Sequence, residues 1–203
     1  GPPGVGKTLM ARVLAEYLGY HVGLIDMTQY QRGSSASSAD LLREIASILR
    51  KNLVSFIIFD EFEKADPEIQ TSLIDVLNTG ILRYSELSRP GSTQTRLQEI
   101  NARLSFMVFT SNAGGEQLVH QPKMGFHQAE EAIPMTDHAS LRQMMVEQNF
   151  AKVILDRLQI VPFGLLSREQ NIEVIRMAAQ KLIGEQAALG LQIEIADLSA
   201  IAE

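Results

Sequence analysis

The sequence predicts an α/β fold in which a parallel sheet is flanked by helices, and three observations support that prediction. A glycine-rich turn at residues 1–8 leads directly into a helical pattern. A nearly all-apolar run at residues 54–59 ends in two acidic residues, which is typical of a central parallel strand that is buried on both faces. Between residues 21 and 110, strand-like and helix-like patterns alternate as they do in βα units.

The composition is ordinary for a globular protein, since 45% of the 203 residues are hydrophobic and 21% are charged. It excludes the disordered and fibrous classes. The net charge of −6 argues against a dedicated nucleic-acid binder, for which a basic surplus is expected. The sequence has no cysteine, so a disulfide scaffold, a thiol nucleophile and a zinc site built on thiolates are excluded. No apolar stretch approaches the roughly 18 residues that span a bilayer, and we expect a cytoplasmic protein.

The first eight residues, GPPGVGKT, fit the phosphate-loop pattern G-x-x-x-x-G-K-[ST]. Glycines let successive backbone N–H groups turn toward phosphate oxygens, where side chains would obstruct them. Lys7 is expected to contact the β- and γ-phosphates of a nucleotide, and Thr8 to ligate Mg²⁺. The following helix points its positive N-terminal end at the same anion. The predicted nucleotide-binding residues of this segment are Gly1, Pro2, Pro3, Gly4, Val5, Gly6, Lys7, Thr8 and Leu9.

Taken alone, this loop has an alternative interpretation as a Gly/Pro turn that leads into an ordinary helix. A phosphate loop follows a buried strand, and the sequence begins at Gly1. Either that strand has been cut away, or the motif is false. The helix after the loop is predicted to be amphipathic and to end at Gly19. Its expected apolar positions are Met10, Val13, Leu14, Tyr17 and Leu18.

A second motif supports the first. The apolar run at residues 54–59 ends in Asp60 and Glu61, and the carboxyl ends of such strands are where open α/β sheets bind ligands. Asp60 is expected to hold the magnesium ion through water or Thr8, and Glu61 to polarise the attacking water. A strand that ends in a solvated acidic turn is the alternative, which the upstream phosphate loop makes the weaker one.

An amide follows the next predicted strand. Residues 104–110 form an apolar, strand-like run that Ser111 and Asn112 follow. At that strand end, the Asn112 side chain can reach the γ-phosphate or the attacking water. A turn-forming residue is the alternative, and the spacing leaves both interpretations open.

The remaining patterns complete the βα alternation. Residues 21–27 are strand-like, and a helix follows the serine-rich stretch at residues 33–38. Asp66 as N-cap and Pro67 at the first helical position begin another helix, which ends near Gly80. The apolar faces of these two helices consist of Leu41, Leu42, Ile45, Ile48 and Leu49, and of Ile69, Leu73, Val76 and Leu77.

Together these motifs resemble those of an AAA+ ATPase, and more narrowly of a Clp-type one. The resemblance implies an AAA+ phosphate-loop NTPase fold, with residues 1–165 as the large α/β subdomain without its first strand. Residues 166–203 would then begin a small helical lid subdomain, which is truncated. The matching segments are GPPGVGKT (1–8), LIDMTQY (24–30), FDEFEKADPEIQ (59–70), FTSNAGGEQL (109–118), KMGF (123–126) and FAKVILDRLQIVPF (150–163).

The resemblance implies a role for each candidate site residue in hydrolysing ATP with Mg²⁺. Lys7 and Thr8 bind phosphate and metal. Asp60 and Glu61 form the second phosphate-site pair, in which Asp60 also holds the metal and Glu61 is the catalytic base. Asn112 is the first sensor of the γ-phosphate.

The resemblance also implies that Arg157 is an arginine finger, which completes the neighbouring subunit's site in a homo-oligomeric ring. The usual family pattern is F-x-P-E-F-x-N-R, whereas residues 150–157 are FAKVILDR, so that only Phe and Arg match. Asp156 is placed to sequester Arg157 in an ion pair. A surface arginine at a helix end is the alternative interpretation.

At the level of function, the resemblance implies the ATPase module of a Clp-like unfoldase, disaggregase or chaperone. Such a module couples ATP hydrolysis in a subunit ring, usually a hexamer, to the movement of a protein client. The implied partners are other copies of the chain and a protein client or adaptor. We expect neither a nucleic-acid partner nor a membrane span.

Two departures from the Clp pattern keep other functions open. Clp-type unfoldases grip their client with an aromatic-glycine pore loop, whereas residues 28–52 contain Tyr30 as their only aromatic residue and Gly33 as their only glycine. This departure favours a nucleotide-gated scaffold or switch that does not thread its client, similar to torsins. The stretch at 81–103 is longer than the Clp hairpin and has four arginines against two glutamates. Its net positive charge is the one feature that favours a nucleic-acid loader, although we interpret it as a solvated loop.

Overall fold

The computed structural model describes residues 1–87, 94–113, 138–167, 169–174 and 176–177. The chain divides into two compact units, Gly1–Phe163 and Gly164–Glu203. In the second unit, the described residues from 169 onward are helical. Within the described part of the chain, no helix is both long and apolar enough to cross a membrane. The KMGF match (123–126) and most of the expected lid subdomain, from residue 178 onward, lie outside the described residues.

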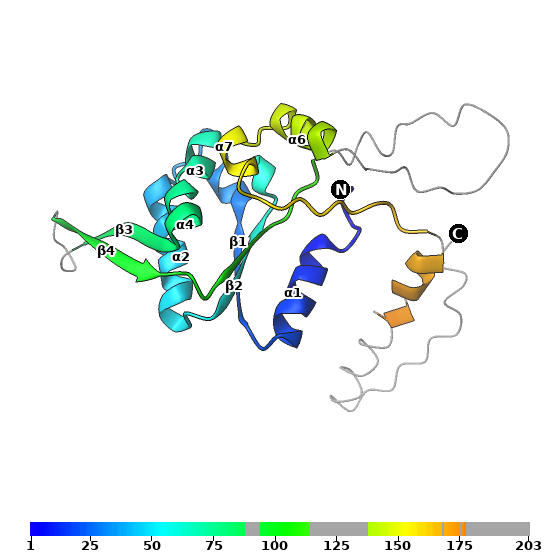
Figure 1. Cartoon of the computed structure of the whole chain (residues 1–203), viewed down its shortest axis with the longest axis horizontal. Coiled ribbons are helices and arrows are strands. Elements are labelled where there is room, and N and C mark those ends of the chain that lie inside the picture. Colours follow the sequence, from blue (N-terminus) through cyan, green and yellow to red (C-terminus); the bar gives the residue numbers. More distant parts are fainter. Residues whose placement is uncertain (88–93, 114–137, 168, 175, 178–203) are drawn as a thin grey trace. The chain divides into compact units, whose positions relative to one another are not determined.

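Three parallel strands form the sheet of the first unit (Figure 1). They are β1 (His21–Asp26), β2 (Ser55–Asp60) and β5 (Phe106–Phe109), in the order β1-β2-β5. The first five residues of the central strand are all buried, as the continuous apolar run predicts. The register places Asp26 beside Asp60. The carboxyl ends of β1 and β2 therefore lie at the same edge of the sheet.

Helices cover both faces of this sheet, α1 (Lys7–Tyr17) on one side and α2 (Ser38–Lys51) on the other (Figure 1). Successive side chains of a strand point to opposite faces, and the core is accordingly divided into two clusters. On one side, Ala11 and Ala15 pack with the alternate β2 residues Phe56 and Ile58. On the other side, the core cluster includes Leu41, Ile45, Leu49, Ile57 and Phe59. The predicted α/β fold, a parallel sheet flanked by helices, is therefore confirmed.

The apolar face expected for α1 does not face the sheet. Ala11 and Ala15 take those positions, because their small side chains let the helix lie close to β2. The residues that the periodicity places in the core are instead 46–86% exposed, and they are Met10, Val13, Leu14, Tyr17 and Leu18.

Two short helices replace the single helix predicted after Asp66. Asp66 Oδ1 accepts a hydrogen bond from the Glu68 N–H at 2.9 Å, and α3 (Pro67–Thr71) begins as predicted. The helix is interrupted before α4 (Ile74–Thr79). Gly80, with φ of 70°, ends α4 in the left-handed conformation that favours glycine.

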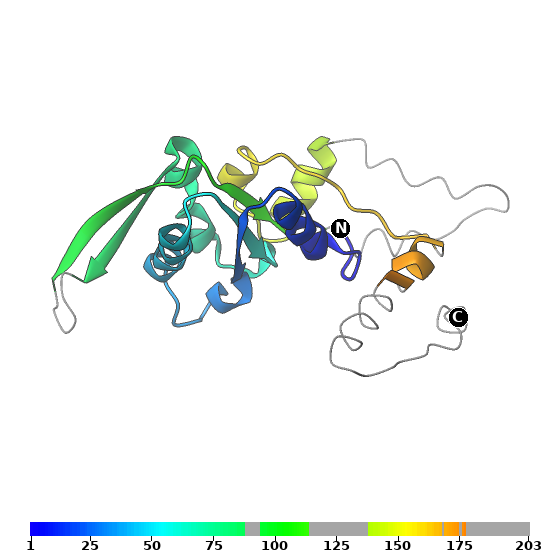
Figure 2. The ribbon, with the colours of Figure 1, turned by 90° about the horizontal axis from the view of Figure 1, so that it is seen from below.

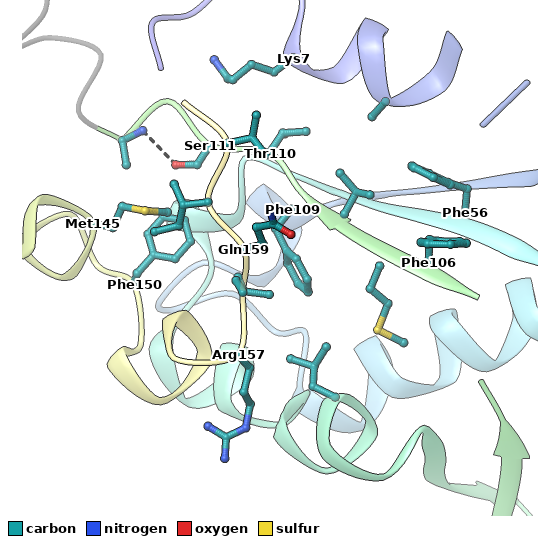
Figure 3. Close-up of a pocket in the computed structure, with 18 of the residues that line it drawn as sticks. Lys7, Phe56, Phe106, Phe109, Thr110, Ser111, Met145, Phe150, Arg157 and Gln159 are labelled. Atoms are coloured by element: carbon teal, nitrogen blue, oxygen red, sulfur yellow. Dashed lines mark hydrogen bonds between the residues drawn. The ribbon is translucent and has the colours of Figure 1, made fainter. Parts of the chain in front are cut away.

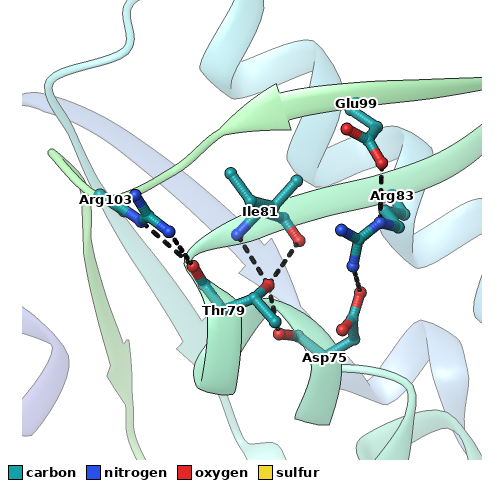
Figure 4. A network of polar contacts seen from close by, with 6 residues as sticks. All are labelled: Asp75, Thr79, Ile81, Arg83, Glu99 and Arg103. Atoms are coloured by element: carbon teal, nitrogen blue, oxygen red, sulfur yellow. Dashed lines mark hydrogen bonds and ion pairs between the residues drawn. The ribbon is translucent and has the colours of Figure 1, made fainter.

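The stretch interpreted as a solvated loop is a β-hairpin, which corrects that prediction. Strands β3 (Ile81–Leu87) and β4 (Thr95–Asn101) pair antiparallel, and the hairpin extends away from the three-stranded sheet (Figures 1 and 2). Arg83 contacts Asp75 at 2.7 Å and Glu99 at 2.8 Å (Figure 4).

The base of the hairpin is held to α4 by a third arginine contact. Arg103 donates from Nε and Nη2 to the Thr79 carbonyl at 3.1 and 3.0 Å (Figure 4). Two of the four arginines of this segment, Arg83 and Arg103, are therefore bonded within the chain. Because these two arginines already have partners, the positive charge of residues 81–103 gives less support to a nucleic-acid partner.

The first unit ends with α6 (His138–Glu147), α7 (Lys152–Leu155) and an irregular segment. Residues 158–163 form no strand and make no ladder with β5. A cavity of about 720 Å³ lies among this segment, β5 and α1, with Phe56, Phe106 and Phe109 on its wall (Figure 3).

Candidate functional site

The two predicted motifs and the predicted amide meet in one pocket of about 310 Å³. Its walls come from the phosphate loop, the start of α1 and the segments that follow β2 and β5. This pocket is distinct from the larger, mainly apolar cavity described above, although Lys7 and Thr110 line both. The residues that line it are Pro3, Gly4, Gly6, Lys7, Thr8, Leu9, Asp60, Glu61, Thr110 and Asn112.

The loop has the backbone that the motif requires. Gly4 and Gly6 have φ values of 78° and 86°, which is the left-handed region where a side chain would be strained. Gly6 is the N-cap of α1, so the N-terminus of that helix opens toward the pocket. Free backbone N–H groups and the helix dipole at this end favour an anion. Three of the predicted residues, Gly1, Pro2 and Val5, do not line the pocket. The carbonyl oxygens of Gly1 and Pro2 accept from Lys7 Nζ.

Thr8 and Asp60 lie in direct contact, although 52 residues separate them. Thr8 Oγ1 donates to Asp60 Oδ1 at 2.7 Å. The Thr110 hydroxyl donates to the same carboxylate oxygen. A carboxylate and two hydroxyls offer the hard oxygen ligands that Mg²⁺ prefers. The chemistry of the donor set at Thr8 and Asp60 therefore fits a magnesium ion.

Asn112 connects the cation of the loop with the acid of the strand. Its Oδ1 accepts from Lys7 Nζ at 2.9 Å, and its Nδ2 donates to Glu61 Oε1 at 3.2 Å. Lys7 Nζ also donates to the carbonyls of Gly1 and Pro2, at 3.0 and 2.5 Å. The side chain of Asn112 thus faces the pocket, which favours the ligand-sensing interpretation over that of a turn former.

The acid itself is held in an uncommon backbone conformation. Glu61 has a φ of 54°, in the left-handed region, at the N-cap of the short helix η2 (Phe62–Lys64). Its N–H donates to Thr110 Oγ1 at 3.3 Å, and the next N–H donates to the Thr110 carbonyl at 3.0 Å. Such a conformation costs about 1–3 kcal/mol and is concentrated at functional sites. Thr110 therefore holds both acids, by its hydroxyl and its backbone.

Sequence reasoning missed two residues of this site, Thr110 and Glu63. Thr110 is 6% exposed and directly precedes the predicted Ser-Asn pair, so its place at a strand end was the available signal. Glu63 Oε1 accepts from the Asn112 N–H at 3.2 Å, while its buried Oε2 has no hydrogen-bond partner among the described residues. Burial lowers the pKa of Lys7, and the charge of Glu63, followed by those of Asp60 and Glu61, opposes that shift.

Arg157 lies outside this pocket. It follows α7, is exposed, and donates from Nε to Asn78 Oδ1 and from Nη1 to the Val153 carbonyl, each at 2.5 Å. In Figure 3, Lys7 and Arg157 lie at opposite ends of the larger cavity. The expected ion pair between Asp156 and Arg157 is not formed, because Asp156 lies 3.9 Å from Arg142 instead. Within its own chain, Arg157 does not join the other candidate residues.

A parallel sheet with a phosphate loop before α1, and with acids and an amide at the adjacent strand ends, defines a phosphate-loop nucleoside triphosphatase. Residues 1–161 match the family described as AAA domain (Cdc48 subfamily). The match covers well over half of the chain, and the chain belongs to this family. It is an ATP-hydrolysing domain of the AAA class.

The chain is also similar to much longer curated proteins. It is 28% identical over 214 residues to the ATP-dependent Clp protease ATP-binding subunit ClpC of Staphylococcus epidermidis, an alignment that covers 97% of this chain and 25% of the relative. The proteins of the same name from Staphylococcus saprophyticus and Staphylococcus aureus are 28% identical over the same length, with 24% and 25% of each relative covered. The chain thus spans about a quarter of the length of these relatives.

Proposed function

We propose that this chain is the ATPase module of a Clp-like protein-remodelling machine, in which hydrolysis in a ring of subunits moves a protein client. The observation that carries the proposal is the convergence of Lys7, Thr8, Asp60, Glu61 and Asn112 on one pocket. Similarity to ClpC proteins over 97% of the chain supports the Clp-like character. As the sequence predicts, we expect the machine to work in the cytoplasm.

Binding of the nucleotide begins at the loop. The triphosphate replaces the carbonyl oxygens of Gly1 and Pro2 as partner of the Lys7 ammonium group, which turns to the β- and γ-phosphates. The N-terminus of α1 adds backbone N–H donors. Mg²⁺, held by Thr8 and Asp60, would supply charge neutralisation at the phosphate oxygens.

Hydrolysis uses the acid that follows β2. The Glu61 carboxylate accepts a proton from a water molecule, whose oxygen attacks the γ-phosphorus as the bond to the β–γ bridging oxygen breaks. Asn112 is hydrogen-bonded both to Glu61 and to Lys7, so it is placed to hold the Glu61 carboxylate before the nucleotide binds. When Lys7 turns to the phosphates, the Asn112 amide is released to bond the γ-phosphate or the water.

Arg157 acts in this proposal on the neighbouring subunit. It is exposed and lies apart from its own pocket, so it is available to another copy of the chain. A cation supplied in trans neutralises charge on the transferred phosphoryl group and makes hydrolysis depend on assembly. Head-to-tail contacts of this kind generate closed rings, and we propose a hexamer with a protein client or adaptor as the further partner.

The proposal is tested by changing Glu61→Gln in the intact protein. The variant should bind ATP with a Kd within about twofold of the unchanged protein, because the amide keeps the shape of the carboxyl group. Its hydrolysis rate should fall about 100-fold or more, since general base catalysis typically contributes that much. Calorimetry measures the first quantity and phosphate release the second. The exposed Glu68→Gln is the matched control, and an unchanged hydrolysis rate in Glu61→Gln would remove Glu61 as the base.

A nucleotide-gated scaffold or switch, torsin-like and without threading, is the second candidate. Tyr30, the only aromatic residue in the interval where the Clp pore loop is expected, is 4% exposed and donates to Glu44 Oε2 at 2.6 Å. Burial and this hydrogen bond also raise the pKa of Tyr30. A tyrosine held in this way is not available to grip a client. ATP-dependent unfolding of a tagged substrate protein favours the remodelling machine, and nucleotide-dependent assembly without unfolding favours the switch.

A further inference from the structure

Two side chains that are not among the predicted site residues connect the turn after the catalytic acid with the segment that leads to the arginine finger. We propose that Gln70 and Asn149 form a clamp, defined here as their two side chains and the backbone groups they bond, that positions Arg157 for the neighbouring subunit. The inference rests on the proposed trans role of Arg157. The clamp lies where α3 and α7 pack side by side (Figure 1).

Gln70 is a fully buried polar residue whose side chain reaches two segments of the chain. Its Nε2 donates to the Ala65 carbonyl at 3.0 Å, and to that of Phe62 at 3.4 Å. The same amide group donates to the Asn149 carbonyl at 2.8 Å, and Oε1 accepts from the Ala151 N–H at 2.8 Å. Buried amides of this kind are costly unless they are bonded. The position of Gln70 is therefore tied to all of these partners together.

The side chain of Asn149 bonds the same turn that Gln70 bonds. It has a φ of 74°, in the left-handed region that asparagine tolerates better than most residues. Its Nδ2 donates to the carbonyls of Glu63 and Ala65, each at 3.0 Å. Three carbonyls of the short turn that follows Glu61 thus accept from the clamp.

The clamp sets the start of the helix that carries the finger. Ala151, whose N–H is bonded to Gln70, is the N-cap of α7. Phe150 beside it is 4% exposed, and its ring lies 5.5 Å from that of Phe62, centroid to centroid. Arg157 follows α7 by two residues, so the orientation at Ala151 determines where the guanidinium group is presented.

When the clamp is broken, the segment that leads to Arg157 should move, and the turn after Glu61 should stay in place. The turn after Glu61 keeps its bonds to Thr110 and its buried Phe62, which contacts Phe59 and Phe109. In the segment 149–151, Gln70 is the side-chain partner of the Asn149 carbonyl and of the Ala151 N–H. Among the described residues, the other backbone hydrogen bonds of this segment join it only to α6 and to α7 itself. Loss of the clamp therefore leaves the chain's own pocket in place and displaces its finger.

Two variants break the clamp in different ways in the intact protein. Gln70→Met keeps an unbranched buried side chain and removes its hydrogen bonds. Asn149→Gly keeps the left-handed backbone, which glycine adopts freely, and removes the amide. Tyr30→Phe, which deletes one buried hydrogen bond elsewhere in the same core, is the matched control. Each clamp variant should lower the hydrolysis rate of the ring about tenfold with KM for ATP within about twofold, while Tyr30→Phe stays within about twofold.

Mixed rings separate an effect on the finger from an effect on the acid. A clamp variant should regain activity when mixed with Glu61→Gln subunits, whose Arg157 is intact, and should gain none from Arg157→Ala subunits. Rescue by Arg157→Ala subunits, rescue by neither, or unchanged activity in a folded variant would overturn the proposal. Glu61→Gln mixed with Arg157→Ala tests the trans role by itself. If that pair does not complement, the proposed role of Arg157 fails before the clamp is judged, and thermal unfolding of both clamp variants identifies any that does not fold.

Discussion

The nucleotide pocket and the segment that carries Arg157 are built by different kinds of contact. In the pocket, the motif residues form hydrogen bonds with one another. Thr8 donates to Asp60 at 2.7 Å, and Lys7 donates to Asn112 at 2.9 Å. The segment that carries Arg157 is instead held by residues that are not among the predicted site residues, since Gln70 bonds the Ala151 N–H and Arg142 bonds the Leu155 carbonyl.

This difference explains why one region follows its family pattern and the other departs from it. In the proposed function, the pocket residues bond each other and a phosphate, so they must keep their identity because each is a ligand or a partner of a ligand. A segment that presents a single side chain needs only the right backbone position. Different residues can supply that position, and in the proposed clamp Gln70 and Asn149 do so. Only Phe150 and Arg157 of the finger pattern are then needed unchanged.

The largest effect is expected in the pocket, for Lys7→Ala. Loss of a charged partner of the phosphates removes about 3 kcal/mol, which corresponds to about a 100-fold increase in the Kd for ATP. Hydrolysis should fall further, about 1000-fold in kcat/KM, because the same charge stabilises the transition state. Calorimetry and phosphate release measure the two quantities, with the exposed Lys51→Ala as control. An ATP affinity equal to that of the unchanged protein would contradict the site assignment.

A smaller effect, confined to the assembled protein, is expected for Arg157→Ala. Removal of one positive donor from a transition state costs about 100-fold in kcat, while the Kd for ATP should stay within about twofold. The unassembled chain should show no difference from the unchanged protein. The exposed Arg176→Ala serves as control. If the rate falls equally in the unassembled chain, Arg157 acts within its own subunit, and the contrast between the two regions is lost.

The smallest effect is expected for Asn78→Ala, which removes the bond from Arg157 Nε to Asn78 Oδ1. The guanidinium group keeps its contact with the Val153 carbonyl, so the finger is loosened rather than removed. The hydrolysis rate of the ring should change by about two- to fivefold, because one hydrogen bond typically contributes about 1 kcal/mol. Steady-state phosphate release measures this change. A loss as large as that of Arg157→Ala would show that Asn78 has a larger role than holding the finger.

Much of the fold followed from local pattern. The buried run at 54–59 identified β2, and Asp66 with Pro67 identified the start of α3, because burial on both faces and helix capping are read from neighbouring residues. Periodicity failed for α1, where two alanines rather than the large apolar residues meet the sheet. The sequence predicts a loop where β3 and β4 form a hairpin, since a strand requires a partner that its own residues do not specify.

The sequence by itself determined the chemistry of this protein, a phosphate loop and a pair of acids, because glycines, lysine, threonine and carboxylates at fixed spacing are set by what a phosphate and a metal ion require. Only the tertiary structure decided how these groups are held. It brought Thr110 onto Asp60, placed Asn112 between Lys7 and Glu61, and joined Gln70 to Asn149 across 79 residues. The physical reason is that a hydrogen bond depends on distance in space, and residues far apart along the chain meet only once the sheet and its helices are packed.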